Sequence, residues 1–295
     1  MSEFQTFSHP YLGIYTKCFL WQTENYNIWI DTGLRPAWEE QKEILSDGRK
    51  NVLLMTHGHW DHIGGIALIR QHGGIVYAHE ADRRHLTDLE WHWQLLFGQF
   101  EKDFDLPPAR KTVFWESVEA PSDLDRAVSD GDVLNFDQLR FRCIGLPGHS
   151  GGSVCYLEET TGTLFTGDGV MGNGFFTGTP QIENYESYIQ SMQHLKTVSV
   201  DRVITDHTDV VPGKDLSRLA QASIDAAERL LKAVRIYTDK TAGNVLTVGD
   251  AAKAIAQAEG KNVGGGTCVS AVAALRHMTD DPRAQKCAER YLFGD

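Results

Sequence analysis

The sequence predicts an α/β protein with layered sheets, followed by an α-helical C-terminal region, and three observations lead to this fold class. Strand-like apolar runs alternate with helical segments over residues 13–78, as in layered α/β architectures. A second group of short strands follows over residues 133–165. After residue 212, apolar residues recur at helical spacing. We therefore divide the chain into residues 1–212 and residues 213–295.

The first group contains four predicted strands and two helices. Its strands are rich in β-branched and aromatic residues, and turn residues separate them. Val52–Met55 is apolar throughout, as expected of a strand that is buried on both faces. The strands are Gly13–Gln22, Tyr26–Ile30, Val52–Met55 and Gly74–Ala78, and the helices lie around Ala37–Leu45 and over residues 66–71.

The second group contains short strands bounded by Gly, Asp and Asn turns. A helical run over Tyr188–Leu195 follows it, and Asp281-Pro282 later predicts an N-cap with proline at the first helical position. The C-terminal region is therefore expected to be mainly α-helical. The strands of the second group are Val133–Phe136, Leu139–Ile144, Ser153–Leu157, Thr163–Phe165 and the short run at residues 203–204.

Residues 82–126 depart from the pattern on either side of them. Thr87-Asp88-Leu89-Glu90 has the sequence of a capping box, and aromatic residues crowd the segment after it. We interpret the segment as a helix packed on the core, and the alternative is an aromatic lid over a substrate. The apolar residues concerned are Trp91, Trp93, Leu95, Leu96, Phe97, Phe100 and Phe104.

Composition limits the compartment and the classes of partner. The five cysteines are scattered without CxxC spacing, which predicts reduced, mostly buried thiols. No apolar run reaches the roughly 20 residues of a membrane span, and the N-terminus does not resemble a signal peptide, so we expect a cytoplasmic protein without a membrane partner. The net charge of the chain is −12, and residues 1–212 alone carry −14, because they contain 30 Asp and Glu but only 16 Lys and Arg. Such acidity disfavours nucleic acid as a partner.

Three histidines and an aspartate lie within six residues, immediately after the predicted strand at residues 52–55. His57 and His59 alternate in an extended segment, so their side chains can face one point. Asp61 and His62 follow as the chain turns, and they can face a second point nearby. Imidazoles suit zinc, iron or manganese, and a carboxylate supplies the negative charge that a second divalent ion requires. The spacing therefore predicts two neighbouring metal ions.

This HxHxDH pattern resembles the metallo-β-lactamase superfamily, and further motifs follow in the order of that family. The resemblance covers roughly residues 10–212. It implies the αββα sandwich of the family, followed here by the helical appendage. The matching segments are the early turn Asp31-Thr32-Gly33, the histidine loop Leu146–Ser150 and the segment Phe165–Asp168.

The resemblance also implies seven ligands for two divalent ions, with zinc favoured and iron or manganese as alternatives. His57, His59 and His149 would bind one ion. Asp61, His62 and His207 would bind the other, and Asp168 would bridge the two. Asp61 is also assigned to catalysis. His194 competes with His207 for the last position, but it lies in the predicted helix at residues 188–195.

A binuclear site implies a hydrolase in which a metal-bridging hydroxide attacks an ester, thioester or lactone carbonyl. His59-Trp60-Asp61-His62, with Gly64-Gly65 and the helical tail, resembles glyoxalase II and related thioesterases and lactonases. One alternative is a phosphodiesterase or nuclease of the same fold, and another is a persulfide dioxygenase with a single iron. A non-enzymatic alternative is a metal-stabilised binding module, because residues 245–278 faintly resemble a winged helix.

The sequence neighbours of the ligands point to a small-molecule acyl substrate. No Lys or Arg lies between Thr56 and Ile69 or between Gly145 and Gln193, although a phosphodiester would require such cations. An acyl chain instead requires apolar walls. The apolar neighbours are Trp60, Ile63, Met171, Phe175 and Phe176.

The remaining histidines are expected to be exposed or hydrogen-bonded, and only His92 lies where it could reach a substrate from the aromatic segment. The apolar residues of the tail are expected to serve core packing or a homodimer. These remaining histidines are His9, His72, His79, His85, His92, His194 and His277.

Overall fold

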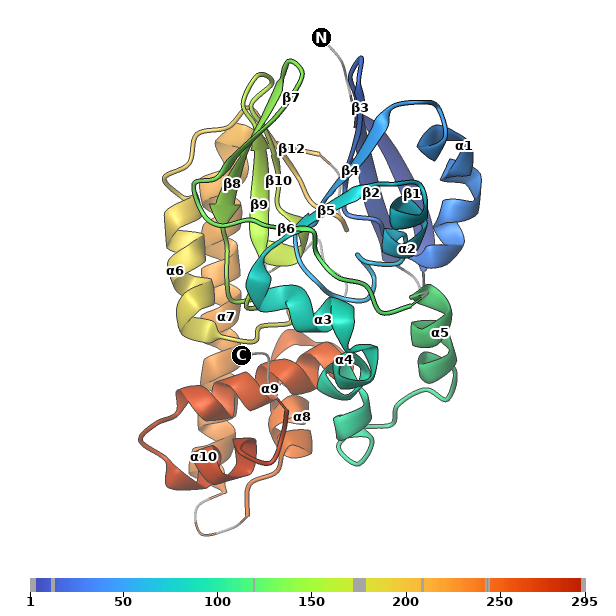
Figure 1. The fold of residues 1–295 in the computed structure, drawn as a ribbon. Coiled ribbons are helices and arrows are strands. Elements are labelled where there is room, and N and C mark those ends of the chain that lie inside the picture. The colour runs from blue at the N-terminus through green and yellow to red at the C-terminus, as the bar shows by residue number, and fades with distance from the viewer. Residues whose placement is uncertain are drawn as a thin grey trace.

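The computed structural model describes residues 4–11, 14–118, 120–171, 179–207, 210–241, 243 and 245–292. Two six-stranded sheets lie face to face in the described chain (Figure 1). The first sheet has the order β1 (Gln5–Tyr11), β2 (Ile14–Gln22), β3 (Tyr26–Ile30), β4 (Lys50–Leu54), β5 (Ile75–Ala78) and β6 (Arg126–Ala127). The second has the order β12 (Val211–Pro212), β11 (Arg202–Ile204), β10 (Thr163–Phe165), β9 (Val154–Glu158), β8 (Leu139–Gly145) and β7 (Val133–Phe136).

Helices cover the outer faces of both sheets, which confirms the predicted αββα sandwich. Helices α1 (Lys42–Leu45) and α2 (Ile66–Gln71) lie outside the first sheet (Figure 1). Helices α6 (Tyr185–Leu195) and α7 (Leu216–Lys240) lie outside the second. The helix expected around residues 37–45 consists of a 3-10 segment, Arg35–Gln41, and the single α-turn of α1.

Successive side chains on a strand point alternately into the core between the two sheets and into the core beneath the outer helices. On β3, Ile28 and Ile30 face the interior between the two sheets, where they join Phe141 and Phe165. Trp29 faces the other way and packs against Trp38, with 4.7 Å between the ring centroids. Because both faces of the strand are buried, its sequence is apolar at nearly every position.

The parallel pairs of strands bring the predicted ligands to one edge of the sandwich. β3, β4 and β5 run parallel, and the histidine-rich segment begins just after β4 ends. In the second sheet β10 and β11 are parallel, so their carboxyl ends reach the same edge. Asp168 follows β10 and His207 follows β11. The pairing thus joins residues that lie about 40 positions apart in the sequence.

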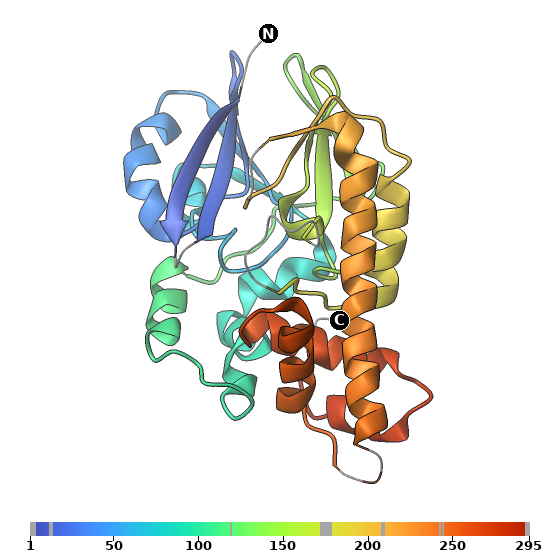
Figure 2. The ribbon, with the colours of Figure 1, turned by 180° about the vertical axis from the view of Figure 1, so that it is seen from behind.

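The C-terminal region is helical, as predicted. The 25-residue α7 begins beside the second sheet and extends beyond it to the other C-terminal helices (Figure 2). These are α8 (Val248–Glu259), α9 (Gly265–His277) and α10 (Pro282–Ala288), and Asp281 caps α10 as expected. None of the described helices is long and apolar enough to cross a membrane. The division at residue 212 and the cytoplasmic compartment stay predictions.

The segment between the two blocks forms three short helices, α3 (Arg83–Thr87), α4 (Leu89–Leu96) and α5 (Ala109–Ser117). The predicted capping box is wrong, because the side chain of Asp88 rather than that of Thr87 accepts the N–H of Trp91 and caps α4. Helix α4 packs against α9, so the aromatic segment joins the two parts of the chain. All five cysteines are free and buried, as expected.

Candidate metal centre

Three histidines form a compact, buried group at the edge of the sandwich. The Nε2 atom of His149 lies 2.9 Å from Nδ1 of His59 and 3.2 Å from Nε2 of His57. Their side chains come from two loops, one after β4 and one after β8, and all three residues are buried. Gly148 makes this approach possible, because a Cβ there would lie 2.4 Å from the backbone of Tyr188 and its φ is +133°.

The outer nitrogens of these rings show which atoms face the centre of the group. His149 Nδ1 lies 2.9 Å from the carbonyl oxygen of Gln181, which can only accept, so this nitrogen carries the hydrogen. Nδ1 of His57 lies 3.1 Å from the hydroxyl of Thr56, which itself donates to Asp31, so this nitrogen carries a hydrogen as well. Nε2 of His57 and Nε2 of His149 therefore present lone pairs to each other. Such an arrangement is unfavourable without a cation and is the usual geometry of a histidine-bound metal.

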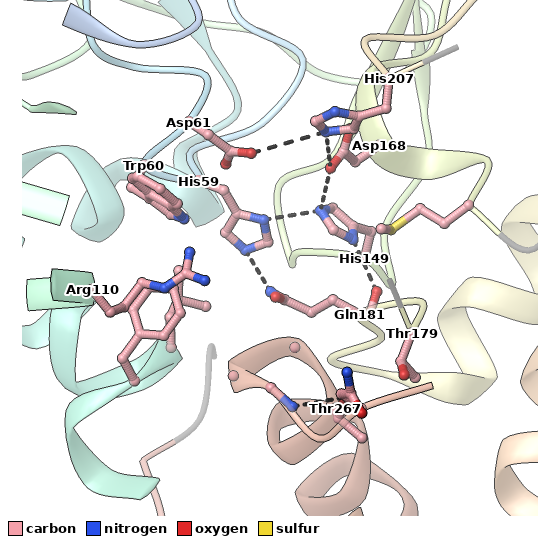
Figure 3. Close-up of a pocket in the computed structure, with 17 residues that line it drawn as sticks. His59, Trp60, Asp61, Arg110, His149, Asp168, Thr179, Gln181, His207 and Thr267 are labelled. Atoms are coloured by element: carbon pink, nitrogen blue, oxygen red, sulfur yellow. Dashed lines mark hydrogen bonds and ion pairs between the residues drawn. The ribbon is translucent and has the colours of Figure 1, made fainter. Parts of the chain in front are cut away.

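A second group combines two carboxylates and two imidazoles. Nε2 of His207 lies 3.0 Å from Oδ1 of Asp168, and Nε2 of His62 lies 3.6 Å from the same oxygen. Asp61 lies at the edge, with Oδ2 3.9 Å from His207 Nε2. One ligand atom from each of the four residues falls within 4.8 Å of the others, so the group could hold a metal ion. The structure thus brings together all seven predicted ligands. Figure 3 shows those that line the pocket, namely His59, Asp61, His149, Asp168 and His207.

The environment of His62 tests whether a metal fits. Its Nδ1 is held by two carboxylates, at 3.1 Å from Asp31 and 3.0 Å from Asp206. Nδ1 therefore carries the hydrogen, and Nε2 faces Asp61 and Asp168 as a buried atom without a hydrogen-bond partner among the described residues. Burial lowers the pKa of His62, but the charges of Asp168 and Asp61 outweigh it and hold that pKa well above its ordinary value, so Nε2 is protonated in the metal-free chain. A divalent cation can take the place of this proton between the two carboxylates. The donor set therefore fits a metal.

The two groups differ in their titration in the metal-free chain. Burial, together with the neighbouring His59, lowers the pKa of His149 to about 4. Burial by itself would lower the pKa of His207. The charge of the ionised Asp168 and its hydrogen bond outweigh burial, so the pKa of His207 is raised to about 9. At neutral pH the first group is neutral, and His62 and His207 of the second are protonated.

Metal loading of the second group is therefore expected to weaken as the pH falls below 9. A metal must displace the protons of His62 and His207, and each proton costs about tenfold in apparent affinity for each pH unit below the pKa of its imidazole. The first group releases no proton from His149 at neutral pH and should keep its affinity to lower pH. Zinc titrations by calorimetry at pH 6.0, 7.5 and 9.0 would measure both. Equal pH dependences for the two binding steps would contradict the assignment.

Four acidic residues support the ligands, and the sequence reasoning assigned a role to none of them. Asp31 accepts the backbone N–H of Thr56 at 2.7 Å and orients His62, although only its turn motif had been noticed. Asp206 lies beside the ligand His207 in the sequence but holds His62. Such carboxylate–histidine contacts fix the tautomer and orientation of a ligand.

Asp82 connects the two histidine loops. Its buried carboxylate accepts the N–H of Gly58 at 2.7 Å in the first loop, and the N–H of Gly152 and the hydroxyl of Ser150 in the second. Glu183 lies on the other side of His59, and burial raises its pKa to about 7. Nothing in the sequence indicated this role for Asp82, because its contacts with the second loop join residues about 70 positions apart.

A pocket of about 220 Å³ adjoins both groups, and the ligands His59, Asp61, His149, Asp168 and His207 line it (Figure 3). Trp60, Leu96, Phe97 and Met171 add the expected apolar wall. Ile63 is buried and is not in this lining, and Phe175 and Phe176 lie outside the described residues. The expected lack of a cation is wrong. Arg110 of α5 lines the pocket. The sequence did not predict this position, because Arg110 is far in the sequence from every ligand.

The other histidines correct two expectations. His92 is fully buried, with Nδ1 3.1 Å from the carbonyl oxygen of His85, and it does not line the pocket. His85 is neither exposed nor hydrogen-bonded, since both of its ring nitrogens are buried without a hydrogen-bond partner among the described residues, and Nδ1 lies 3.9 Å from Oδ1 of Asp82. It lies beside His59, with 5.5 Å between ring centroids. The side chain of His9 lies outside the described part of the chain.

The aromatic segment can be tested as core or lid with two variants. Trp93 is buried against Phe97 and Phe114, so Trp93→Ala should lower the free energy of unfolding by about 3–5 kcal/mol. Phe97 also lines the pocket, so Phe97→Ala should raise KM while the metal content is unchanged. Chemical denaturation and steady-state kinetics on both proteins separate the effects. A stable Trp93→Ala protein with a raised KM would favour a lid.

Comparison with known proteins agrees with this geometry. The sequence pattern of the metallo-beta-lactamase superfamily matches residues 13–207. The chain belongs to this superfamily. A metallo-beta-lactamase family protein from Thermus thermophilus has a similar fold, with a TM-score of 0.74 at 19% identity over 94% of this chain and 93% of that one. That match includes the helical region after residue 212 and confirms the predicted fold.

Three known proteins are similar in sequence to this chain. An acyl-coenzyme A thioesterase from Gallus gallus is 27% identical over 77% of this chain and 90% of its own length. A hydroxyacylglutathione hydrolase from Haemophilus influenzae is 28% identical over 62% and 80%. An atrochrysone carboxyl ACP thioesterase from Aspergillus fumigatus is 25% identical over 83% of this chain, and the match spans 66% of that protein. These names support the predicted hydrolase and the resemblance to glyoxalase II and thioesterases.

Proposed function

We propose that this protein is a binuclear metal-dependent hydrolase that cleaves thioesters, with esters and lactones as related substrates. The position of Asp168 carries the binuclear proposal. Its carboxylate lies 3.9 Å from His149 in the first group and 3.0 Å from His207 in the second, so it is within reach of metals in both. A carboxylate there offsets the repulsion between two dications.

The residues divide the work of hydrolysis between them. When bound, the two metals would supply a water of lowered pKa and polarise the carbonyl oxygen of the substrate. His57, His59 and His149 would hold one metal, and Asp61, His62 and His207 the other. Asp61 has the most exposed side chain of the carboxylate ligands, at 14%, and it lines the pocket. It is therefore placed to hold or release a proton on the substrate side.

The acyl substrate is supported by the relatives and by the pocket wall. Two of the three relatives are named as thioesterases, and the third is named as a hydroxyacylglutathione hydrolase. Trp60, Phe97 and Met171 provide apolar contacts for an acyl chain. Zinc is the favoured metal because imidazoles predominate among the ligands, and iron or manganese is the alternative.

A phosphodiesterase of the same fold is the second candidate, and one observation favours it. Arg110 places a permanent positive charge in the pocket, where a phosphodiester would require one. A single cation among apolar walls nevertheless matches an acyl substrate better than a nucleic acid, whose binding rests on many phosphate contacts.

Side-by-side kinetics test the proposal. We expect the zinc-loaded protein to hydrolyse thioesters with a kcat/KM at least about tenfold above that for bis-p-nitrophenyl phosphate, a difference of about 1.4 kcal/mol in transition-state stabilisation. The panel would contain acyl thioesters, p-nitrophenyl esters and lactones. Protein from which the metal has been removed is the control. A preference for the phosphodiester would replace the proposal with the second candidate.

A further inference from the structure

Arg110 is a cation without a carboxylate partner among the residues that the structure describes. Its guanidinium stacks over the ring of Phe97, 5.4 Å from the centroid, and no described carboxylate lies within ion-pair distance of it. Figure 3 shows it beneath Trp60, across the pocket from Thr179. Among the described residues that line the pocket, it is the one Lys or Arg. The protein therefore holds a planar, always charged donor beside the metal centre.

Thr179 is a second polar group in the same pocket. Thr179 is buried, with 6% exposure, and its hydroxyl has no hydrogen-bond partner among the described residues. A buried hydroxyl without a partner costs free energy, and a ligand in the pocket would remove that cost. Arg110 and Thr179 thus line one pocket from two distant segments of the chain, and both lack an acceptor among the described residues.

The first turn of the 13-residue α9 completes the polar part of the wall. Gly264, Gly265, Gly266 and Thr267 all line the pocket, and the first N–H groups of a helix have no acceptor inside it. A Cβ at Gly265 would lie 2.3 Å from the carbonyl oxygen of Leu96, so glycine permits this turn to lie against α4. The helix dipole adds positive potential at that end.

We propose that Arg110 binds an anionic group of the substrate while its thioester carbonyl lies at the metal centre, and that Thr179 and the first turn of α9 donate hydrogen bonds to the same substrate from the opposite wall. This proposal rests on the proposed function and specifies its substrate class. The anion is a carboxylate, carried either by the acyl group or by the thiol. A guanidinium can bind a carboxylate through two parallel hydrogen bonds. Thr179 and the first turn of α9 lie across the pocket and can donate to other polar atoms of the same substrate. The apolar wall then contacts the chain between the anion and the carbonyl.

Three thioesters distinguish the two sources of the carboxylate. The S-hexanoyl ester of N-acetylcysteamine is neutral on both sides, its S-adipoyl counterpart carries a carboxylate on the acyl side, and S-hexanoylglutathione carries carboxylates on the thiol side. We expect kcat/KM for one of the two anionic substrates to exceed that for the neutral one by about 10- to 100-fold, as for a charge-assisted hydrogen bond. The preferred substrate identifies the source.

Arg110→Gln should lower kcat/KM for the preferred anionic thioester to about the level of the neutral one and so abolish the preference. Lys111→Gln is the matched control. Lys111 is the exposed neighbour on α5, it stacks on Trp93, and it does not line the pocket. An equal loss on all three substrates, or a preference that survives Arg110→Gln, would overturn the proposal.

Binding without turnover separates this inference from the proposed function. Calorimetry on zinc-loaded protein would compare adipate with hexanoate, and glutathione with N-acetylcysteamine. The metal-binding group is common to each pair, so the extra affinity of the anionic member reports the carboxylate site. We expect a gain of about tenfold for one pair, retained in Lys111→Gln and lost in Arg110→Gln. A protein inactive on every thioester but showing this gain would refute the proposed function alone, and no gain in either pair would refute the site.

Discussion

Asp168→Ala is expected to keep the fold, to reduce the bound metal from two ions per chain toward one, and to lower kcat/KM by at least about 100-fold. Changes to residues that merely orient a ligand already cost about 10- to 100-fold in metal affinity or activity. Asp168 contacts both groups, so its loss leaves two adjacent dications without a carboxylate between them. Metal analysis after gel filtration and steady-state kinetics on a thioester would measure both effects.

Asp239→Ala provides the matched control for this experiment, because Asp239 is an exposed aspartate on α7 outside the site. It should retain two metals and full activity, and circular dichroism should show the same helix content for both variants. An Asp168→Ala protein with two bound metals and normal turnover would show that the bridging role is wrong.

Removal of the metals is expected to abolish hydrolysis and to destabilise the protein, and zinc should restore both properties. A ligand present at 1,000 times its dissociation constant stabilises the folded state by about 4 kcal/mol. The loss should be pronounced here, because the metal-free chain buries inward-facing lone pairs on His57 and His149. Protein dialysed against a chelator would be assayed for metal content, thermal unfolding and thioesterase activity before and after zinc is added.

Magnesium addition is the control for a nonspecific ionic effect, because it prefers oxygen ligands and an octahedral site. It should restore neither stability nor turnover at the concentration at which zinc does. Chelated protein that contains no measurable metal and hydrolyses thioesters at the original rate would remove the metal from the mechanism.

The local motifs predicted the ligand-bearing loops because each motif carries its chemistry within a few residues. His57, His59, Asp61 and His62 lie together in the chain, and a strand must end where they begin, so their convergence can be inferred without tertiary information. The error at Thr87 has a local cause as well. Thr87 and Asp88 can both cap a helix, and the backbone of the preceding α3 decides which of them does.

The supporting residues could not be predicted, because their role depends on contacts between distant segments. Asp82 is an ordinary acidic residue in the sequence, yet its carboxylate holds the loops of His59 and His149 together. Glu183 and Asp206 are likewise distinguished only by the imidazoles beside them. A lone carboxylate has no periodicity or spacing to mark it, so only the packed structure shows its partner.

Hydrophobic period predicted the α/β elements and the helical tail, and ligand spacing predicted the histidine-rich loop of His57 to His62, because both are local properties of the sequence. The resemblance to the superfamily supplied the sandwich and the ligands His149, Asp168 and His207. Only the tertiary structure decided what surrounds the metals. The sequence near the ligands contains no cation, but the fold brings Arg110 of α5, Thr179 and the first turn of α9 into the same pocket. The physical reason is that a pocket is assembled from side chains of packed elements, and its charge depends on which elements meet there.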